Sequence, residues 1–572
     1  MSIGQFYYKN NNTKKVSFKP STMKSVLLTV LFFLFSNVLC SQSPSKYEVR
    51  AVWLTTIGGI DWPHCYAQSS QSIARQKAEL CNILDKLQHA KINTILLQTR
   101  IRATTIYPSS FEPWDGCLSG IPGRSPGYDA LKFAVEECHK RGMEIHAWVV
   151  TLPAGKWNQL GCRLLRKHYP GMLLKIGQEG FLNPAAYQTA NYLSQICGEI
   201  VQNYDVDGIH LDYIRYPETM KFKGTEVEGR QNITRIVKAI HDEIKQLKPW
   251  VKISCSPLGK FSDLSRYASY GWNAYSTVRQ DAQGWLKDGL MDELFPMLYF
   301  QGNQFYPFAL DWSENNFGRI VVPGLGIYFL HPDEKDWNLD VVTRQMNISR
   351  QKCNGFAFFR SKYLTDNTKG IYSFLSEQFD LYPALIPPME WESRAVPASP
   401  TSLKVNVIDS TTYVQWNKAL PIGGSSYLTY NIYASNDFPV NINDVRNLLV
   451  TRYQSTNFCI KTTRPCYFAI TSMDRYGNES LPLQMAKQFS TSLEAQKELL
   501  TVKYGMIHCL NKVQNVDAKY FLIESLQGNV LKVIPFTSNG NITLGTLPKG
   551  GYVLRTLNTK RVSHRIGVFY IK

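Results

Sequence analysis

Short apolar segments alternate with amphipathic segments through the first two thirds of the chain. The apolar segments are rich in β-branched and aromatic residues, which is typical of buried strands. The segments between them repeat apolar residues every three to four positions, which indicates amphipathic helices. We predict strands at 48–56, 93–101, 144–150, 208–213, 251–257, 293–300, 320–328 and 355–360. The clearest predicted helices span 73–90, 130–141, 187–204 and 233–247.

This alternation covers residues 46–380 and predicts one domain. Eight repeats of a strand and a helix are typical of a (β/α)8 TIM-like barrel, in which parallel strands form a closed core. A doubly wound open sheet is the alternative, but no G-x-G-x-x-G follows any predicted strand. Because the barrel buries its own core, we expect a chain that ends near Met389 to fold alone.

The rest of the chain predicts small β domains. Prolines gather in residues 381–397, which indicates a linker. Residues 398–489 resemble a fibronectin type III sandwich, with Trp416 as the buried tryptophan and Tyr467 in a late strand. Residues 497–572 predict a further β domain whose "LPKGGYVLR" stretch resembles a secretion-sorting domain, with an accessory sandwich as the alternative. The predicted fold class is therefore α/β, a (β/α)8 TIM-like barrel followed by two small all-β domains.

The N-terminal segment has the pattern of an export signal. Residues 1–40 carry five lysines and no acidic residue, followed by an apolar run and then small and polar residues. The apolar run is shorter than the roughly 20 residues that span a membrane. We predict a signal peptide over residues 1–40, export to the periplasm, cell envelope or cell surface, and no transmembrane segment. Cys40 leaves a lipid anchor open as an alternative.

Charge and cysteines limit the partners that we expect. The net charge of +18 suits an acidic polymer such as a cell wall, although an ordinary basic composition explains it equally well. None of the twelve cysteines falls in a C-x-x-C pair. His146, His210 and Asp212 leave a metal open as an alternative, but no third ligand with zinc-like spacing appears. We predict no metal, no cofactor and no nucleic-acid partner, and we make no prediction of the oligomeric state.

Polar side chains gather toward the carboxyl ends of the predicted strands. His210 and Asp212 share one face of the segment 208–213, because residues two apart in a strand point the same way. In a barrel, chemistry is carried at these strand ends. The polar or aromatic residues in equivalent places are Gln98, Arg100, Arg102, His146, Trp148 and Tyr299. We expect Asp212 at the barrel mouth, kept ionised by Arg100 or Arg215; a structural aspartate is the alternative.

Five segments of the predicted barrel resemble one known family, and they occur in the family's order. They are "EVRAVWLTT", "INTILLQTRIRATTIYPSSFEPWDGCLSG", "PGYDALKFAVEECHKRGMEIHAWV", "LNPAAYQTANYLSQICGEIVQNYDVDGIHLDYIRYP" and "RQDAQGWLKDGLMDELFPMLYF". They resemble the bacterial glycosyl-hydrolase-like proteins related to family 10 glycosidases. The resemblance implies a TIM-like barrel that acts on polysaccharide. One branch of the family cleaves peptidoglycan glycan strands that have been stripped of their peptides.

The resemblance also implies positions for site residues. The family's "EPW" falls on Glu112 to Trp114, its "HAW" on His146 to Trp148, its strand-four aspartate on Asp212, and the aspartate of its "D…W…G" helix on Asp281. The chain departs from the family where Val149-Val150 replaces Asn-Pro and where Pro296-Met297 replaces Pro-Gln. Both changes remove polar groups from the rim. A chitinase-type D-x-x-D-x-D-x-E motif is absent, because Ile214 stands where the glutamate belongs.

Hydrolysis of a glycosidic bond ordinarily needs two carboxyl groups. We predict Asp212 as the nucleophile, base or electrostatic stabiliser and Glu112 as the acid, with Asp61, Glu218 and Asp281 as alternatives for the second group. The predicted substrate-binding residues are Arg100, Trp114, His146, Trp148, His210, Arg215, Asp281 and Tyr299. The predicted function is an exported glycoside hydrolase that cleaves polysaccharide, foremost amino-sugar glycan strands of peptidoglycan. The alternatives are a catalytically silent glycan-binding barrel and a hydrolase of host or dietary glycans.

Overall fold

A nine-stranded parallel sheet forms the centre of the structure. The computed structural model describes residues 44–220, 223–265, 267, 269, 271–408, 411–420, 428–461, 466–485, 500, 502–503, 505–508, 518–526, 528–537, 541–559 and 563–571. The predicted signal peptide over residues 1–40 lies outside them. The sheet order is β10-β9-β8-β7-β3-β2-β1-β12-β11. The strands are β1 (Val49–Leu54), β2 (Thr94–Arg100), β3 (Glu144–Val150), β7 (Gly208–Asp212), β8 (Lys252–Cys255), β9 (Glu293–Leu294), β10 (Ile320–Val321), β11 (Gly324–Leu325) and β12 (Gly355–Phe358).

The sheet closes on itself through an interrupted strand. β10 pairs with β9 on one side, and β11 pairs with β12 on the other. Only Val322 and Pro323 separate β10 from β11, so the two are halves of one strand that joins the ends of the sheet. With these halves counted together, eight parallel strands form a TIM-like barrel, which confirms the predicted fold.

The predicted sixth strand is much shorter than expected. It was predicted over 293–300, and β9 ends at Leu294. Pro296 lacks a backbone N–H and cannot donate to a neighbouring strand. The backbone N–H of Leu298 instead bonds to the carbonyl of Pro296, so the chain turns there.

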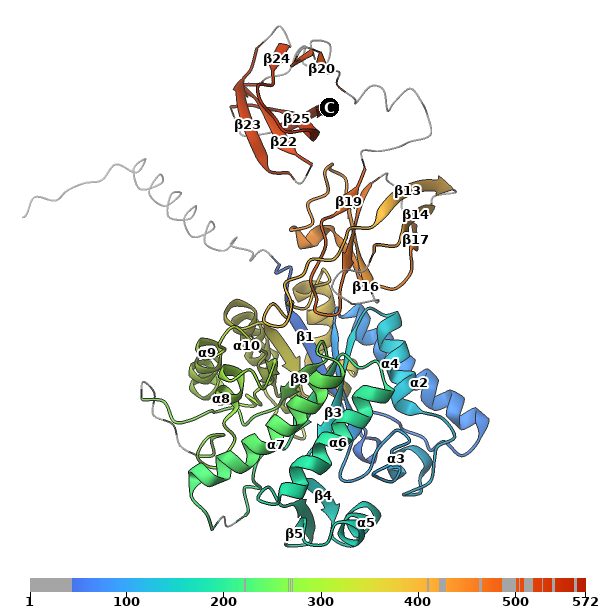
Figure 1. Ribbon diagram of the computed structural model, residues 1–572, viewed down its shortest axis with the longest axis vertical. Coiled ribbons are helices and arrows are strands. Elements are labelled where there is room, and N and C mark those ends of the chain that lie inside the picture. Colours follow the sequence, from blue (N-terminus) through green and yellow to red (C-terminus); the bar gives the residue numbers. More distant parts are fainter. Residues whose placement is uncertain are drawn as a thin grey trace, which may run out of the picture. The chain divides into compact units, whose positions relative to one another are not determined.

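Helices surround the sheet, as Figure 1 shows for α2, α4, α6 and α7. Two of them begin earlier than the apolar pattern predicted, because polar capping boxes start them. Ser69 caps α2 with Ser72, and Thr225 caps α7 with Glu228. The helices are α2 (Ser70–His89), α3 (Gly116–Ser119), α4 (Ala130–Lys140), α5 (Leu160–His168), α6 (Tyr187–Asn203), α7 (Glu226–Leu247), α8 (Ala282–Lys287), α9 (Tyr306–Glu314), α10 (Leu339–Lys352), α11 (Ser361–Thr365) and α12 (Ile371–Phe374). Short helical turns are η1 (Ile57–Gly59), η2 (Gly302–Gln304), η3 (Ile327–Leu330), η4 (Thr368–Gly370), η5 (Leu375–Phe379) and η6 (Val445–Asn447).

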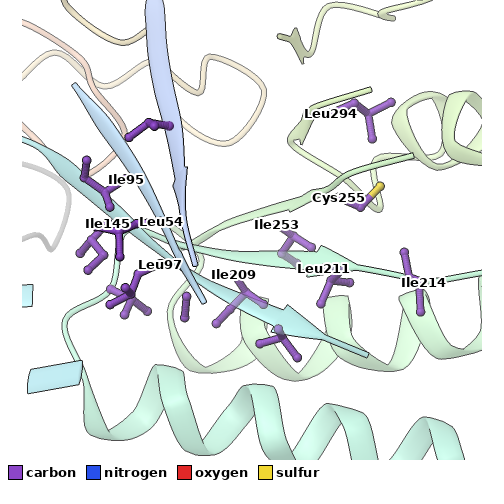
Figure 2. Packing of buried hydrophobic residues seen from close by; sticks show 14 of the residues in the cluster. Leu54, Ile95, Leu97, Ile145, Ile209, Leu211, Ile214, Ile253, Cys255 and Leu294 are labelled. Carbon is purple, nitrogen blue, oxygen red and sulfur yellow. The ribbon is translucent and has the colours of Figure 1, made fainter. Parts of the chain in front are cut away.

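Alternate residues along each barrel strand belong to two separate cores. The first set packs between the sheet and the helices, and Figure 2 shows Leu97, Ile145, Ile209 and Ile253 among its members. The second set fills the barrel interior and includes Trp53 and Trp148. Asp212 pairs with Val150, which belongs to the interior set, so Asp212 points into the barrel as its two-residue spacing from His210 predicted.

A small antiparallel sheet is inserted between β3 and α6. It consists of β4 (Pro153–Lys156), β6 (Glu179–Leu182) and β5 (Leu173–Ile176), in that spatial order. This sheet was not predicted from the sequence. Its strands have four residues each, which is too short for an alternating pattern to stand out.

Beyond residue 400 the described chain forms antiparallel sheets. The first pair of sheets has the orders β13-β14-β17 and β16-β15-β18-β19 around a core that contains Trp416. The second pair has the orders β20-β21-β24 and β23-β22-β25-β26. These strands are β13 (Thr401–Ile408), β14 (Thr411–Asn417), β15 (Thr429–Ser435), β16 (Leu448–Tyr453), β17 (Asn457–Lys461), β18 (Tyr467–Met473), β19 (Leu483–Gln484), β20 (Val502–Lys503), β21 (Met506–His508), β22 (Tyr520–Ser525), β23 (Val530–Pro535), β24 (Asn541–Thr543), β25 (Gly550–Leu557) and β26 (Ser563–Ile571). Small all-β regions after the barrel are thus confirmed.

A buried network of charges closes the amino-terminal end of the barrel. The Lys252 ammonium lies 2.6 Å from Glu144 Oε2, and Arg452 Nη1 of β16 lies 2.8 Å from Glu144 Oε1. Arg452 also pairs with Asp207, whose other oxygen lies 2.8 Å from His139 Nε2. Burial alone would raise the pKa of Glu144, but the charges of Lys252 and Arg452 lower that pKa to about 2. We call these five residues the floor network.

Candidate active site

Asp212 is the last residue of β7, and its carboxylate is held by three hydrogen-bond donors. Trp148 Nε1 donates to Oδ2 at 3.1 Å, and Ser256 Oγ donates to Oδ1 at 2.9 Å. The backbone N–H of Tyr213 donates to Oδ1 at 2.8 Å. The side chain is half-buried. These three hydrogen bonds fix the carboxylate in one orientation.

The predicted ion pair of Asp212 with Arg100 or Arg215 is not formed. Among the described residues, no cation lies within ion-pair distance of Asp212. Arg100 Nη2 lies 2.6 Å from Glu112 Oε1, and its Nη1 donates to the carbonyl of Thr151 at 2.8 Å. Arg215 Nη2 lies 2.9 Å from Glu218 Oε1. Both arginines therefore pair with glutamates, and the Asp212 carboxylate is contacted by neutral donors instead.

Glu112 lies in a buried ion pair that does not suit a general acid. Its side chain is 0% exposed and meets Arg100 in a forked contact, with Nε 3.0 Å from Oε1 and 2.9 Å from Oε2. Tyr192 donates its hydroxyl to Oε1 at 2.6 Å. A general acid must carry a proton and reach the leaving oxygen. Arg100 contacts both oxygens of this fully buried carboxylate, so neither oxygen is open to a substrate, and this geometry opposes the sequence-based choice of Glu112.

His210 and His146 lie inside the barrel and are fully buried, so neither is placed to contact a substrate. Trp53 Nε1 donates to His210 Nε2 at 3.1 Å. Since an indole nitrogen only donates, Nε2 of His210 must accept, and its Nδ1 then donates to Ser254 Oγ at 2.9 Å. Burial and, to a smaller extent, the nearby His146 lower the pKa of His210 well below its usual range. The ring therefore stays in this neutral tautomer.

His146 lies next to the floor network. Its Nε2 lies 3.3 Å from Glu144 Oε2, and its Nδ1 lies 3.8 Å from Glu293 Oε2. The imidazole lies directly against Gly208, where a Cβ atom would approach Nδ1 to 2.7 Å. The absence of a side chain at Gly208 therefore leaves room for the His146 ring. The substrate-binding role predicted for His146 does not fit this position.

Tyrosines flank Asp212 at the mouth. Tyr299 is half-buried, and its pKa is raised well above the usual range by burial and, to a smaller degree, by the charges of Tyr328 and Asp212. Its ring lies 5.5 Å from that of Phe359. Trp148 is buried beneath and binds Asp212 through its indole N–H. Trp148 thus positions the carboxylate, and Tyr299 lies near enough for the charge of Asp212 to contribute to its raised pKa.

Glu218 is connected to Asp212 through one tyrosine. The hydroxyl of Tyr213 donates to Glu218 Oε2 at 2.5 Å, while the Tyr213 backbone binds Asp212. The Arg215 guanidinium lies 3.8 Å from the centre of the Tyr213 ring. Burial would raise the pKa of Glu218, but Arg215 and the tyrosine hydroxyl lower it. Glu218 is therefore an ionised neighbour of the site.

The other predicted residues lie at the periphery. Asp61 accepts from Thr55 Oγ1 at 2.7 Å and pairs with Arg360. Asp281 caps α8 by accepting from the Gly284 N–H at 3.1 Å, and burial raises its pKa. Trp114 is half-buried in the loop after β2 and packs against the outer core. None of the three has a described contact with Asp212.

The residues that sequence reasoning missed are Trp53, Ser254 and Ser256. They share the interior parity of β1 and of the end of β8, so the strand period could have identified them. A serine, however, has no distinctive signal by itself. Within the described chain, no group of three His, Cys, Asp or Glu side chains is arranged to hold a metal. No described helix is long and apolar enough to cross a bilayer.

Comparison with known proteins finds a family that the barrel resembles. Residues 48–230 and 225–328 match the family described as glycosyl hydrolase-like 10. The matched residues lie within the barrel and make up just under half of the chain. The match includes β1, β2, β3, β7, β8 and β9 and therefore all of the contacts made by the Asp212 carboxylate.

Two curated bacterial proteins are similar to this chain. The glycosyl hydrolase YngK of Bacillus subtilis is 28% identical in an alignment of 510 positions that covers 82% of this chain and 98% of that protein. The glycosyl hydrolase DigH of Escherichia coli K12 is 28% identical in an alignment of 391 positions that covers 59% of this chain and 88% of that protein.

Among solved structures, the glycoside hydrolase domain of PgaB (BpsB) from Bordetella bronchiseptica aligns with 57% of this chain and 98% of its own. The sequence identity is 11% and the TM-score is 0.40.

Proposed function

We propose that this protein is an exported glycoside hydrolase that cleaves amino-sugar glycan strands of peptidoglycan at the barrel mouth. The observation that carries the proposal is the Asp212 carboxylate, which three neutral donors hold at the carboxyl end of β7. Chemistry in barrels of this class sits at that end of the strands. The family match supports a hydrolase of glycosidic bonds.

Asp212 would act on the positive charge that develops at the sugar ring. Glycoside hydrolysis passes through an oxocarbenium-like transition state, which a fixed carboxylate stabilises as a charge or attacks as a nucleophile. A carboxylate that is already oriented needs no rearrangement as the charge forms. Because Trp148 and Ser256 do not neutralise its charge, Asp212 keeps its full attraction for the ring.

The second group is not Glu112 in this proposal. Glu218, ionised and joined to Asp212 through Tyr213, fits a base or an acceptor for a sugar hydroxyl. Asp281 has the raised pKa that a proton donor needs, but it lies at the start of α8.

The rival function is a glycan-binding barrel without turnover. The pairing of Glu112 with Arg100 favours it, since that contact removes the acid which the sequence had suggested. The test is to incubate the mature protein with peptidoglycan strands stripped of peptides, and separately with chitin and dietary glucans, and to measure new reducing ends. New ends from the stripped strands alone support the proposal. Binding without product in every case establishes the rival, and product from another glycan alone changes the substrate.

A further inference from the structure

A groove of about 590 Å³ lies beside the mouth, outside the residues that contact Asp212. It is bounded by the inserted sheet, by the segment before α6 and by the first turns of α7. Tyr216, four residues after Asp212 along the chain, lines it, which links the groove to the β7 end of the site. Its size is in the range of ligand pockets and has room for about one disaccharide. Among its other lining residues are Asn183, Lys223, Gln231, Asn232 and Arg235.

Arg235 is the charged group that the fold leaves uncompensated in this groove. Its Nη2 donates to the backbone carbonyl of Pro184 at 2.9 Å, which anchors the guanidinium. Its Nε is buried and has no hydrogen-bond partner. In the described chain, no carboxylate lies within ion-pair distance of Arg235 or of Lys223. Backbone carbonyls therefore hold the guanidinium in place, and its positive charge has no counter-charge from this part of the chain.

The acidic group of the groove does not compensate these cations. Glu228 lines the groove, but its Oε2 accepts from the Thr225 backbone N–H at 2.7 Å and from Thr225 Oγ1 at 3.1 Å. That carboxylate is committed to the start of α7. The groove therefore presents two positive side chains whose natural complement is an anion brought by the ligand.

An exposed aromatic ring stands next to Arg235. Tyr187 is 74% exposed, and the Arg235 guanidinium lies 4.3 Å from the centre of its ring. The stacking orients the ring, and most of the Tyr187 side chain stays open to solvent. An aromatic face beside a cation suits a sugar that carries a carboxylate.

We propose that this groove is a distal subsite that binds a carboxylate-bearing amino sugar of the glycan, through Arg235 and Lys223, with Tyr187 beside it. The inference rests on the proposed function and names a feature of its substrate. In peptidoglycan, the lactyl carboxylate is free only after the amide bond to the stem peptide has been hydrolysed. The subsite would therefore select stripped strands, and an amide hydrolysis must supply its substrate.

The test compares two forms of one glycan with the full-length mature protein. Stripped strands carry free carboxylates, and carbodiimide coupling to ammonia converts those groups to neutral amides without changing strand length. We expect the wild type to bind the free-carboxylate strands about tenfold more tightly, the lower end for a charge-assisted hydrogen bond. Equal binding of the two forms, or binding of neither, overturns the subsite.

Variants assign the preference to the groove. Arg235→Gln should abolish the discrimination by weakening only the free-carboxylate strands, and Arg235→Lys should keep part of it. The matched control is Lys238→Gln, which removes one positive charge from the same helix at a side chain that is 62% exposed and paired with Asp242. If Arg235→Gln lowers the thermal stability, Lys223→Gln replaces it. Equal weakening of both glycan forms by either groove variant contradicts the proposal.

The subsite and the hydrolysis fail in different ways. If binding depends on the carboxylate but no new reducing ends appear, the subsite is supported and the hydrolase is contradicted. If free and amidated strands are cleaved equally, the hydrolase is supported and the subsite is contradicted.

Discussion

Arg452 of the β16 strand reaches across 308 positions of sequence to place its Nη1 2.8 Å from Oε1 of Glu144 in the barrel. The same guanidinium pairs with Asp207, so one side chain from the first pair of antiparallel sheets meets two carboxylates of the floor network. Both carboxylates are buried. The barrel thus takes part of its charge balance from residues beyond residue 400.

Arg452→Met should destabilise the protein through this contact. Removal of one partner leaves buried carboxylates with fewer cations, which costs about 3–5 kcal/mol in comparable pairs. We expect a fall of that size in the free energy of unfolding, measured by denaturant titration. Arg446→Met removes an exposed arginine of the same region and should leave the denaturation midpoint unchanged. A midpoint shift of equal size in both variants would show that the contact of Arg452 with the floor network contributes no more to stability than the exposed Arg446 does.

The same contact changes our expectation for a shortened chain. From the sequence, a chain ending near Met389 was expected to fold alone. Such a chain lacks Arg452, and Glu144 would retain Lys252 but lose its second cation. We now expect the shortened chain to be less stable than the full chain by a margin similar to that of Arg452→Met. Matching denaturation midpoints for the shortened and full chains would refute this.

Acid should unfold the protein partly by protonating Glu144. Its pKa is lowered to about 2 in the folded chain, against about 4.3 in an unfolded one. The stabilisation is therefore fully present above pH 4.3 and is lost as the pH falls toward 2, a total of about 3 kcal/mol. Denaturation midpoints between pH 6 and pH 2 would reveal it. In Arg452→Met the drop should be smaller, and an identical drop would assign it to other carboxylates.

Asp212→Asn keeps the shape of the side chain and removes its charge. We expect turnover of stripped glycan strands to fall by at least about 10²-fold, the scale of losing one positioned catalytic group. The melting temperature should change little, since no cation is left unpaired by the change. Asp242→Asn, an exposed substitution on α7, serves as the control. An Asp212→Asn protein that unfolds easily but retains its activity per folded molecule would make this aspartate structural.

Glu112→Gln should affect stability rather than chemistry. The substitution leaves the buried Arg100 guanidinium without its counter-charge, which we expect to cost about 3 kcal/mol. Tyr192→Phe removes only the hydroxyl donor and should cost about 1 kcal/mol. Activity per folded molecule should stay within about twofold in both. A stable Glu112→Gln protein with activity reduced by two orders of magnitude would restore Glu112 as the acid.

The strand period carried most of what the sequence revealed. β3 has the predicted bounds, 144–150, and Asp212 lies on the interior face as its spacing from His210 required. Pairings between side chains far apart in the sequence could not be predicted, because periodicity shows only which residues share a face of one helix or strand. Arg100 and Arg215 were both plausible partners for Asp212, and nothing local shows that Glu112 and Glu218 take them.

The break of the closing strand at Val322 and Pro323 gives the barrel wall two halves of unequal rigidity. β9, β10 and β11 contribute two residues each to the ladder, and the prolines at 296 and 323 donate no backbone hydrogen bond. On the opposite side, β3 is paired over five consecutive positions with the strand that carries Asp212. We expect amide hydrogen exchange to begin along the segments 293–300 and 320–328, through local opening of that half. Tyr299 and Tyr328 lie in these two segments, so we expect the tyrosine-bearing side of the mouth to be more mobile than the end of β7 that carries Asp212.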